Sequence, residues 1–155
     1  MKDVLGVRAE PVAIHWAIVG GTGDKPILCA SGTETAPHSF RDEESLAWIR
    51  QRLIYIMETY SPCKVAVRYA ERTAKGSNTD SAKARCRVDG VVLEAAGSKN
   101  LEVVAGTMKT FASHSGRASP KEDLASGHLR EIDWSEYKGN LQEAIYVAFS
   151  LLPRG

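Results

Sequence analysis

The sequence of 155 residues predicts a single α/β domain, in which a mixed sheet of five strands carries helices on both faces. Three observations support this. Three short apolar runs, joined by turns that contain glycine or proline, occupy the amino-terminal third. Two further apolar runs of strand length then alternate with segments whose apolar residues recur at helical spacing. The length suits one buried core, and residues 1–155 contain no evident internal repeat or linker.

The amino-terminal third is predicted to form an antiparallel meander. Residues 4–7, 12–19 and 27–30 are apolar runs of strand length. The segment Gly20–Lys25 between the second and third runs is rich in glycine. It lacks the Gly-Lys-Ser/Thr ending of a phosphate-binding loop and precedes a strand, so a hairpin turn is the better interpretation.

A long helix is predicted from Asp42 to Tyr60, followed by a strand. Ser39 and Asp42 have the spacing of a capping box, and Ser61-Pro62 ends the helix. One buried stripe is expected at helical spacing: Leu46, Ile49, Leu53, Ile56 and Met57. The apolar run Val65–Val67 follows the helix, so we expect this strand to run parallel to the first.

A second long helix is predicted from Asp80 to Gly97, with capping spacing at Ser77–Asp80. Its small residues recur on one side: Ala82, Cys86, Gly90, Leu93, Ala96 and Gly97. Such a stripe permits close approach of another helix, either the helix at 42–60 or the same helix of a second subunit.

The remaining elements are shorter. In order they are a strand at 101–105, one helical turn at 107–112, a Gly/Ser-rich loop at 113–119, a short helix from Pro120 to about Gly127, and a terminal helix at 140–152 that Pro153 stops.

Composition excludes several classes of protein. The chain is 43% apolar and 25% charged, which is ordinary for a globular domain. It has no apolar run long enough for a membrane span and no secretory signal pattern, so a cytoplasmic location is expected. The three cysteines are odd in number and widely spaced, so they are predicted to be reduced and buried. The four histidines have no metal-ligand spacing, and no metal or other cofactor is expected.

Charge is unevenly distributed along the chain. Residues 64–87 carry seven bases against two acids, and residues 106–121 carry three bases and no acid. Residues 122–143 reverse the balance, with six acids against two bases. The basic middle of the chain is expected to attract phosphates, although a merely solvated face is an equally good interpretation.

Two predicted strands deliver an arginine at corresponding places. The first runs Val4-Leu5-Gly6-Val7-Arg8, and the later one runs Lys64-Val65-Ala66-Val67-Arg68. A guanidinium stays protonated and has no acceptor lone pair, so neither side chain can hold a divalent cation.

The order of elements and several short motifs resemble the RuvC-type Holliday junction resolvases, which have a ribonuclease H-like fold. The motifs are the opening Leu5–Glu10, the second strand Val65–Arg68, the Ala-rich helix Ser81–Ala96, the strand leading to a lysine at Val103–Lys109, and the start of the terminal helix at Asn140–Ala144. The chain is also similar to small RuvC-like bacterial proteins whose strand ends carry basic groups.

Carried over by this resemblance, the family's four acidic positions fall on Arg8, Arg68, Asn140 and Glu143. Cleavage of a phosphodiester by two metal ions needs several carboxylates as ligands. With one carboxylate in four, the resemblance implies a degenerate catalytic corner and no catalytic residue. Glu143 also suits a structural role at the start of a helix.

Two roles are open for the arginines. Together with Lys109, which the inherited geometry places nearby, Arg8 and Arg68 are expected to form an anion pocket facing Glu143. Alternatively, an internal Arg–Glu pair replaces the metal as a structural element. Further candidate contacts with nucleic acid are Arg72, Lys75 and Arg117.

Three hypotheses of function follow. The favoured one is a non-catalytic binding module for a DNA or RNA backbone or for a protein partner. The second is a metal-dependent junction nuclease with rearranged carboxylates around Glu143, in which Glu10, Glu71 or Asp133 replaces the missing acids. The third is a structural homodimer that pairs through the helix Ser81–Ala96.

Overall fold

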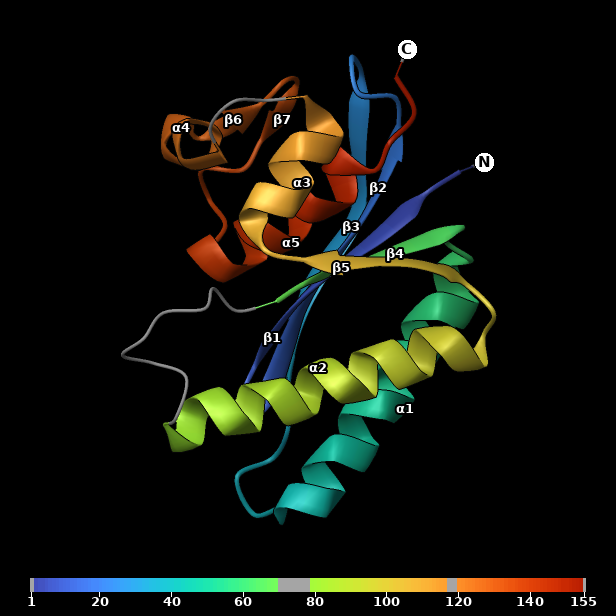
Figure 1. The fold of residues 1–155 in the computed structure, drawn as a ribbon, viewed down its shortest axis with the longest axis vertical. Helices are drawn as coiled ribbons and strands as arrows, with labels where there is room; N and C mark the ends of the chain where they lie inside the picture. The colour runs from blue at the N-terminus through green and yellow to red at the C-terminus, as the bar shows by residue number, and fades with distance from the viewer. Residues whose placement is uncertain (1, 70–78, 117–119, 155) are drawn as a thin grey trace.

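The structure, a computed structural model that describes residues 2–69, 79–116 and 120–154, confirms the predicted α/β class (Figure 1). Five strands form the central sheet in the order β3-β2-β1-β4-β5. They are β1 (Val4–Glu10), β2 (Ala13–Gly21), β3 (Pro26–Thr35), β4 (Lys64–Arg68) and β5 (Glu102–Gly106).

The strand pairing is that of the predicted mixed sheet. β1, β2 and β3 form the antiparallel meander, and the turn at Gly20–Lys25 joins β2 to β3 as a hairpin, as expected. β4 lies beside β1 and runs parallel to it, in a register that pairs Arg8 with Arg68. Because β1 continues to Glu10, Arg8 lies two residues before the end of its strand and not at the end.

Helices cover both faces of the sheet (Figure 1). One face carries α1 (Asp42–Tyr60) and α2 (Asp80–Ser98). On the other face lie α3 (Met108–Ser115), α4 (Pro120–Ser126) and α5 (Gly139–Ser150), with a small hairpin made of β6 (His128–Leu129) and β7 (Ile132–Asp133). Successive side chains of a strand point to opposite faces, and the buried residues accordingly form two hydrophobic clusters, one on each side.

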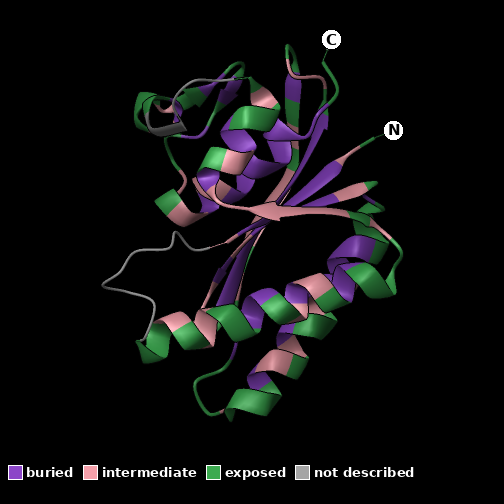
Figure 2. Cartoon of the chain, in the orientation of Figure 1, coloured by how far each residue is buried: buried purple, intermediate pink, exposed green. Residues whose placement is uncertain are grey.

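The helix α5 is the most deeply buried of the five. Its residues from Ala144 to Ser150 are all buried, between the sheet and the outer helices (Figure 2). The close approach of α5 to β1 depends on Gly6, because a Cβ at that position would overlap the main-chain oxygen of Ala144 and touch Ala148. This contact sets the amino-terminal turn of α5 above the later residues of β1.

The predicted packing face of α2 is mostly wrong, although Ala96 is buried and Leu93 packs against the core as expected. The buried residues of this helix are Val88, Asp89, Val92, Ala95 and Ala96. Cys86, Gly90 and Gly97 are exposed, and a Cβ built on Gly90 or Gly97 meets nothing within 4 Å. α2 therefore packs on α1 and the sheet through its branched residues, since these bury more apolar area than the glycines.

Three smaller expectations also need correction. The first residue before α1 is Arg41, whose amide donates to Glu44 Oε1 at 3.0 Å, so the capping box lies two residues later than predicted. Thr79 caps α2 by accepting a hydrogen bond from the amide of Ala82, whereas Ser77 lies outside the described residues. All three cysteines are exposed and free, and not buried.

The carboxyl-terminal third differs in detail from the prediction. α3 extends to Ser115, where Gly116 ends it in a left-handed conformation. The hairpin of β6 and β7 gave no apolar pattern and was not predicted. No helix in the described part of the chain is long and apolar enough to cross a membrane.

Candidate functional site

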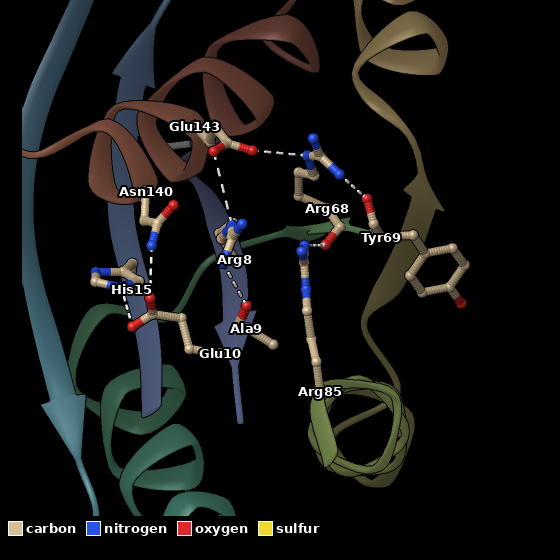
Figure 3. A network of polar contacts seen from close by, with 9 residues as sticks. All are labelled: Arg8, Ala9, Glu10, His15, Arg68, Tyr69, Arg85, Asn140 and Glu143. Carbon is tan, nitrogen blue, oxygen red and sulfur yellow. Dashed lines mark hydrogen bonds and ion pairs between the residues drawn. The ribbon is translucent and has the colours of Figure 1, made fainter. Parts of the chain in front are cut away.

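The site begins with two arginines on neighbouring parallel strands. Leu5 and Val7 point toward α1 and α2, so the side chain of Arg8 points to the opposite face, under the start of α5. The same alternation in β4 turns Arg68 toward that face (Figure 3). The parallel register brings the two guanidiniums side by side.

Helix α5 supplies the carboxylate that faces them. Oε1 of Glu143 lies 2.8 Å from Nε of Arg68, and Oε2 lies 3.7 Å from Nε of Arg8. The three side chains are 9–16% exposed, so water screens these ion pairs weakly. The internal Arg–Glu pair that the sequence analysis considered is therefore formed, and both oxygens of Glu143 are engaged.

We call the ion-pair cluster of Arg8, Arg68 and Glu143 the arginine corner. A second group of contacts adjoins it. The amide of Asn140 donates to Oε1 of Glu10 at 2.6 Å, and Nε2 of His15 lies 2.9 Å from Oε2 of the same carboxylate. Nδ1 of His15 lies 2.9 Å from the hydroxyl of Thr33. Glu10 is thus the displaced acid that, among the candidates in the described residues, contacts α5 beside Glu143, and its two oxygens are held by an amide and an imidazole.

Helix α2 contributes two residues that sequence reasoning missed. Nη2 of Arg85 donates to the main-chain oxygen of Arg68 at 3.4 Å (Figure 3). Burial, together with the guanidiniums of Arg8 and Arg68, lowers the pKa of Arg85. Arg85 therefore adds a third positive charge to the arginine corner from the other side of β4.

Asp89 lies one helical turn after Arg85 and is 7% exposed. Burial raises the pKa of its carboxyl to about 6, against the opposing effect of Arg85, Arg8 and Arg68. No hydrogen-bond partner for its Oδ1 is found among the described residues. The sequence places Asp89 beside the apolar residues Val88 and Val92, which could have marked it as buried. It was missed because the small residues of α2 were taken as the packing face.

The other candidate residues either make no side-chain contact with this cluster within the described residues or lie outside those residues. Lys109 is exposed in the first turn of α3, directly after β5, which is the strand beside β4. Arg72, Lys75 and Arg117 fall outside the described residues, as does Glu71. Asp133 lies in β7 and accepts hydrogen bonds from Ser135, so it belongs to a local turn.

These residues do not fit a divalent cation. Magnesium requires several oxygen ligands with little competing positive charge. At the arginine corner the oxygens of Glu143 face two guanidiniums, and those of Glu10 are already bonded. Within the described ranges, no group of three or more His, Cys, Asp or Glu side chains is arranged to hold a metal ion.

The order of the strands and the helices on both faces of the sheet give this chain the ribonuclease H-like fold. RuvC from Thermus thermophilus has the same fold, with a TM-score of 0.78 and 19% identity over 96% of this chain and 92% of that one. The structure of T. thermophilus RuvC in complex with a Holliday junction substrate gives a TM-score of 0.77 and 17% identity over 97% and 92%.

Sequence comparison agrees with this assignment. No family model matches the chain. The crossover junction endodeoxyribonuclease RuvC of Dehalococcoides mccartyi (strain ATCC BAA-2266 / KCTC 15142 / 195) is 28% identical over 122 residues, which cover 77% of this chain and 72% of that protein. The chain is therefore similar in sequence to this RuvC protein and similar in fold to the T. thermophilus RuvC structures.

Proposed function

We propose that this RuvC-like protein binds the phosphate backbone of nucleic acid at the arginine corner and does not cut it. The observation that carries the proposal is the pair of guanidiniums on β1 and β4, ion-paired with Glu143 where a nuclease of this fold needs metal-binding oxygens. T. thermophilus RuvC has been seen with a Holliday junction, which supports DNA as the first ligand to test.

Charge at the arginine corner favours an anionic ligand. Arg8, Arg68 and Arg85 contribute three positive charges, whereas Glu143 and Asp89 contribute at most two negative ones, and the adjoining carboxylate of Glu10 is bonded to Asn140 and His15. A phosphate offers the same geometry to a guanidinium as a carboxylate does, with one more oxygen. In this proposal Glu143 is the internal counter-ion that a backbone phosphate displaces or joins.

Fluorescence anisotropy with a labelled four-way junction, a duplex and an RNA strand tests binding. We expect affinity for the DNA probes to fall as salt rises, because bound phosphates release counter-ions. Glu143→Gln frees the arginines and is expected to raise affinity severalfold, whereas Glu136→Gln, the same charge change on an exposed residue, is expected to change it less than about twofold.

Lys109→Gln provides a variant that keeps the arginine corner intact. Lys109 is exposed, so the change leaves the fold in place, and it is expected to reduce the salt dependence by about one counter-ion. Absence of binding to all three probes at low salt would remove the proposal, and a protein partner would then be the remaining ligand class.

The competing hypothesis is a nuclease with rearranged carboxylates around Glu143. Glu10 is the observation in its favour, because its carboxylate contacts Asn140 at the corner. Incubation of the same DNA probes with Mg²⁺ or Mn²⁺ at high protein concentration separates the hypotheses. We expect uncut DNA, and strand scission that Glu143→Gln abolishes would establish the nuclease.

A further inference from the structure

A groove lies at the opposite end of α5 from the arginine corner. It has a volume of about 350 Å³ and is enclosed by the β2–β3 turn, the end of α3, the turn between β6 and β7, and the segment after α5. Glu143 and Ser150 are seven residues apart on α5, so the helix separates the two places by about 10 Å. A groove of this size accommodates a small polar ligand.

Two arginines line this groove from different parts of the chain. Arg130 comes from the turn between β6 and β7, and Arg154 follows the terminal helix. Both are exposed, and neither forms an ion pair with a carboxylate of the described residues. The other titratable groups that line the groove are His114 and Asp24, so the lining carries an excess of positive charge.

The main chain next to both arginines is fixed by local structure. The amide of Gly23 donates to the oxygen of Pro153 at 2.9 Å, which ties the β2–β3 turn to the residue before Arg154. Nη2 of Arg154 lies so close to Gly116 that a Cβ there would be 3.2 Å away. Arg130 adopts a positive φ of 56°, an uncommon conformation for arginine. Each arginine thus starts from a fixed main-chain position at the rim.

We propose that this groove binds a phosphate group between Arg130 and Arg154. Guanidiniums bind phosphate oxygens through paired, charge-assisted hydrogen bonds, and here neither arginine is ion-paired with a carboxylate of the described residues as Arg8 and Arg68 are with Glu143. The phosphate belongs either to a free ion or to a nucleic-acid backbone. This inference does not rest on the proposed function, because its residues are separate from the arginine corner.

The probes are inorganic phosphate and a single-stranded oligothymidylate, followed by NMR of the amide groups. With inorganic phosphate we expect saturable shifts at Gly23, Gly116 and Ser150, which surround the groove. If the oligonucleotide produces the same shifts at lower concentration, the phosphate is that of a backbone. If inorganic phosphate alone produces them, the ligand is a free phosphate.

The double variant Arg130→Asn and Arg154→Gln is expected to weaken phosphate binding by about tenfold or more. Asparagine tolerates the positive φ at position 130, so the turn is preserved. The matched control is Arg41→Gln with Arg50→Gln, which removes two charges from exposed residues elsewhere and is expected to change binding less than about twofold.

Asp24→Asn gives a change in the opposite direction. It removes the carboxylate that lines the groove, so phosphate binding is expected to strengthen a few fold, on the order of what one screened charge contributes. Equal losses in the double variant and its control, or shifts confined to residues outside the groove, would overturn the inference.

Discussion

Two arginines lie near each end of α5, and the two pairs differ in whether a carboxylate faces them. At the arginine corner, Arg8 and Arg68 are less than one-fifth exposed and face Glu143 at 3.7 and 2.8 Å. In the groove, Arg130 and Arg154 are exposed and have no carboxylate partner within the described part of the chain. Arg8 and Arg68 therefore stabilise the fold and can also bind a ligand, whereas Arg130 and Arg154 can bind a ligand without stabilising the fold.

This difference separates stability from binding. A partly buried charge that loses its partner costs several kcal/mol, because the remaining charge is left in a poorly solvated place. An exposed arginine without a partner contributes little to the free energy of unfolding. The residues of the arginine corner should consequently affect stability and binding together, and those of the groove should affect binding only.

The largest expected effect is that of Arg68→Met. Loss of this guanidinium leaves Glu143 without its nearest partner and is expected to lower the free energy of unfolding by about 3–5 kcal/mol. Arg154→Met, the same chemical change in the groove, is expected to lower it by less than about 0.5 kcal/mol. Urea unfolding followed by circular dichroism measures both.

A further variant tests the same cluster. The triple variant Arg8→Met, Arg68→Met and Glu143→Leu removes all three charges of the arginine corner and is expected to recover much of the lost stability, since apolar residues of similar size replace buried ion pairs at little cost. Equal destabilisation by Arg68→Met and Arg154→Met would contradict the claim that the arginine corner, and not the groove, stabilises the fold.

Asp89→Asn tests the charge balance of the arginine corner through pH. The folded-state pKa of Asp89 is raised from 3.8 to about 6. The folded protein therefore binds this proton more tightly than the unfolded chain does. The resulting stability is present at low pH and is lost as pH rises between about 4 and 6.

Asp89→Asn is expected to remove this loss. The difference in the free energy of unfolding between the variant and the wild type should grow by about 1–3 kcal/mol as the pH rises from 4.5 to 7.5, since one unit of pKa corresponds to about 1.4 kcal/mol. Urea unfolding at both pH values measures the difference, with Glu102→Gln, an exposed acid on β5, as the control. A gain that is independent of pH would show that Asp89 does not titrate in this range.

Much of the arginine corner was predictable from local pattern. The apolar runs ending at Arg8 and Arg68 indicated parallel strands, and equal strand direction places such residues side by side. Asn140 and Glu143 are three residues apart, so a helix presents both on one side. The resemblance to RuvC connected these elements to one place in the fold.

Other parts of both regions depend on tertiary contacts that sequence pattern does not encode. The contact between Glu10 and Asn140 joins residues 130 positions apart. Asp89 was missed because small residues were taken as the packing face of α2, whereas Val88 and Val92 bury more apolar area. Arg130 sits in a hairpin of two-residue strands, which are too short to show a periodic pattern.

The smallest expected effect concerns the exposed face of α2 at Gly90. Nothing lies within 4 Å of a Cβ at Gly90, and glycine is a poor helix former, so Gly90→Ala is expected to stabilise an isolated subunit by about 0.5–1 kcal/mol. If two copies pair through Ser81–Ala96, as the sequence predicts, light scattering gives a dimeric mass and the alanine weakens association by crowding the contact. A monomeric mass together with a stabilised Gly90→Ala would contradict the predicted dimer.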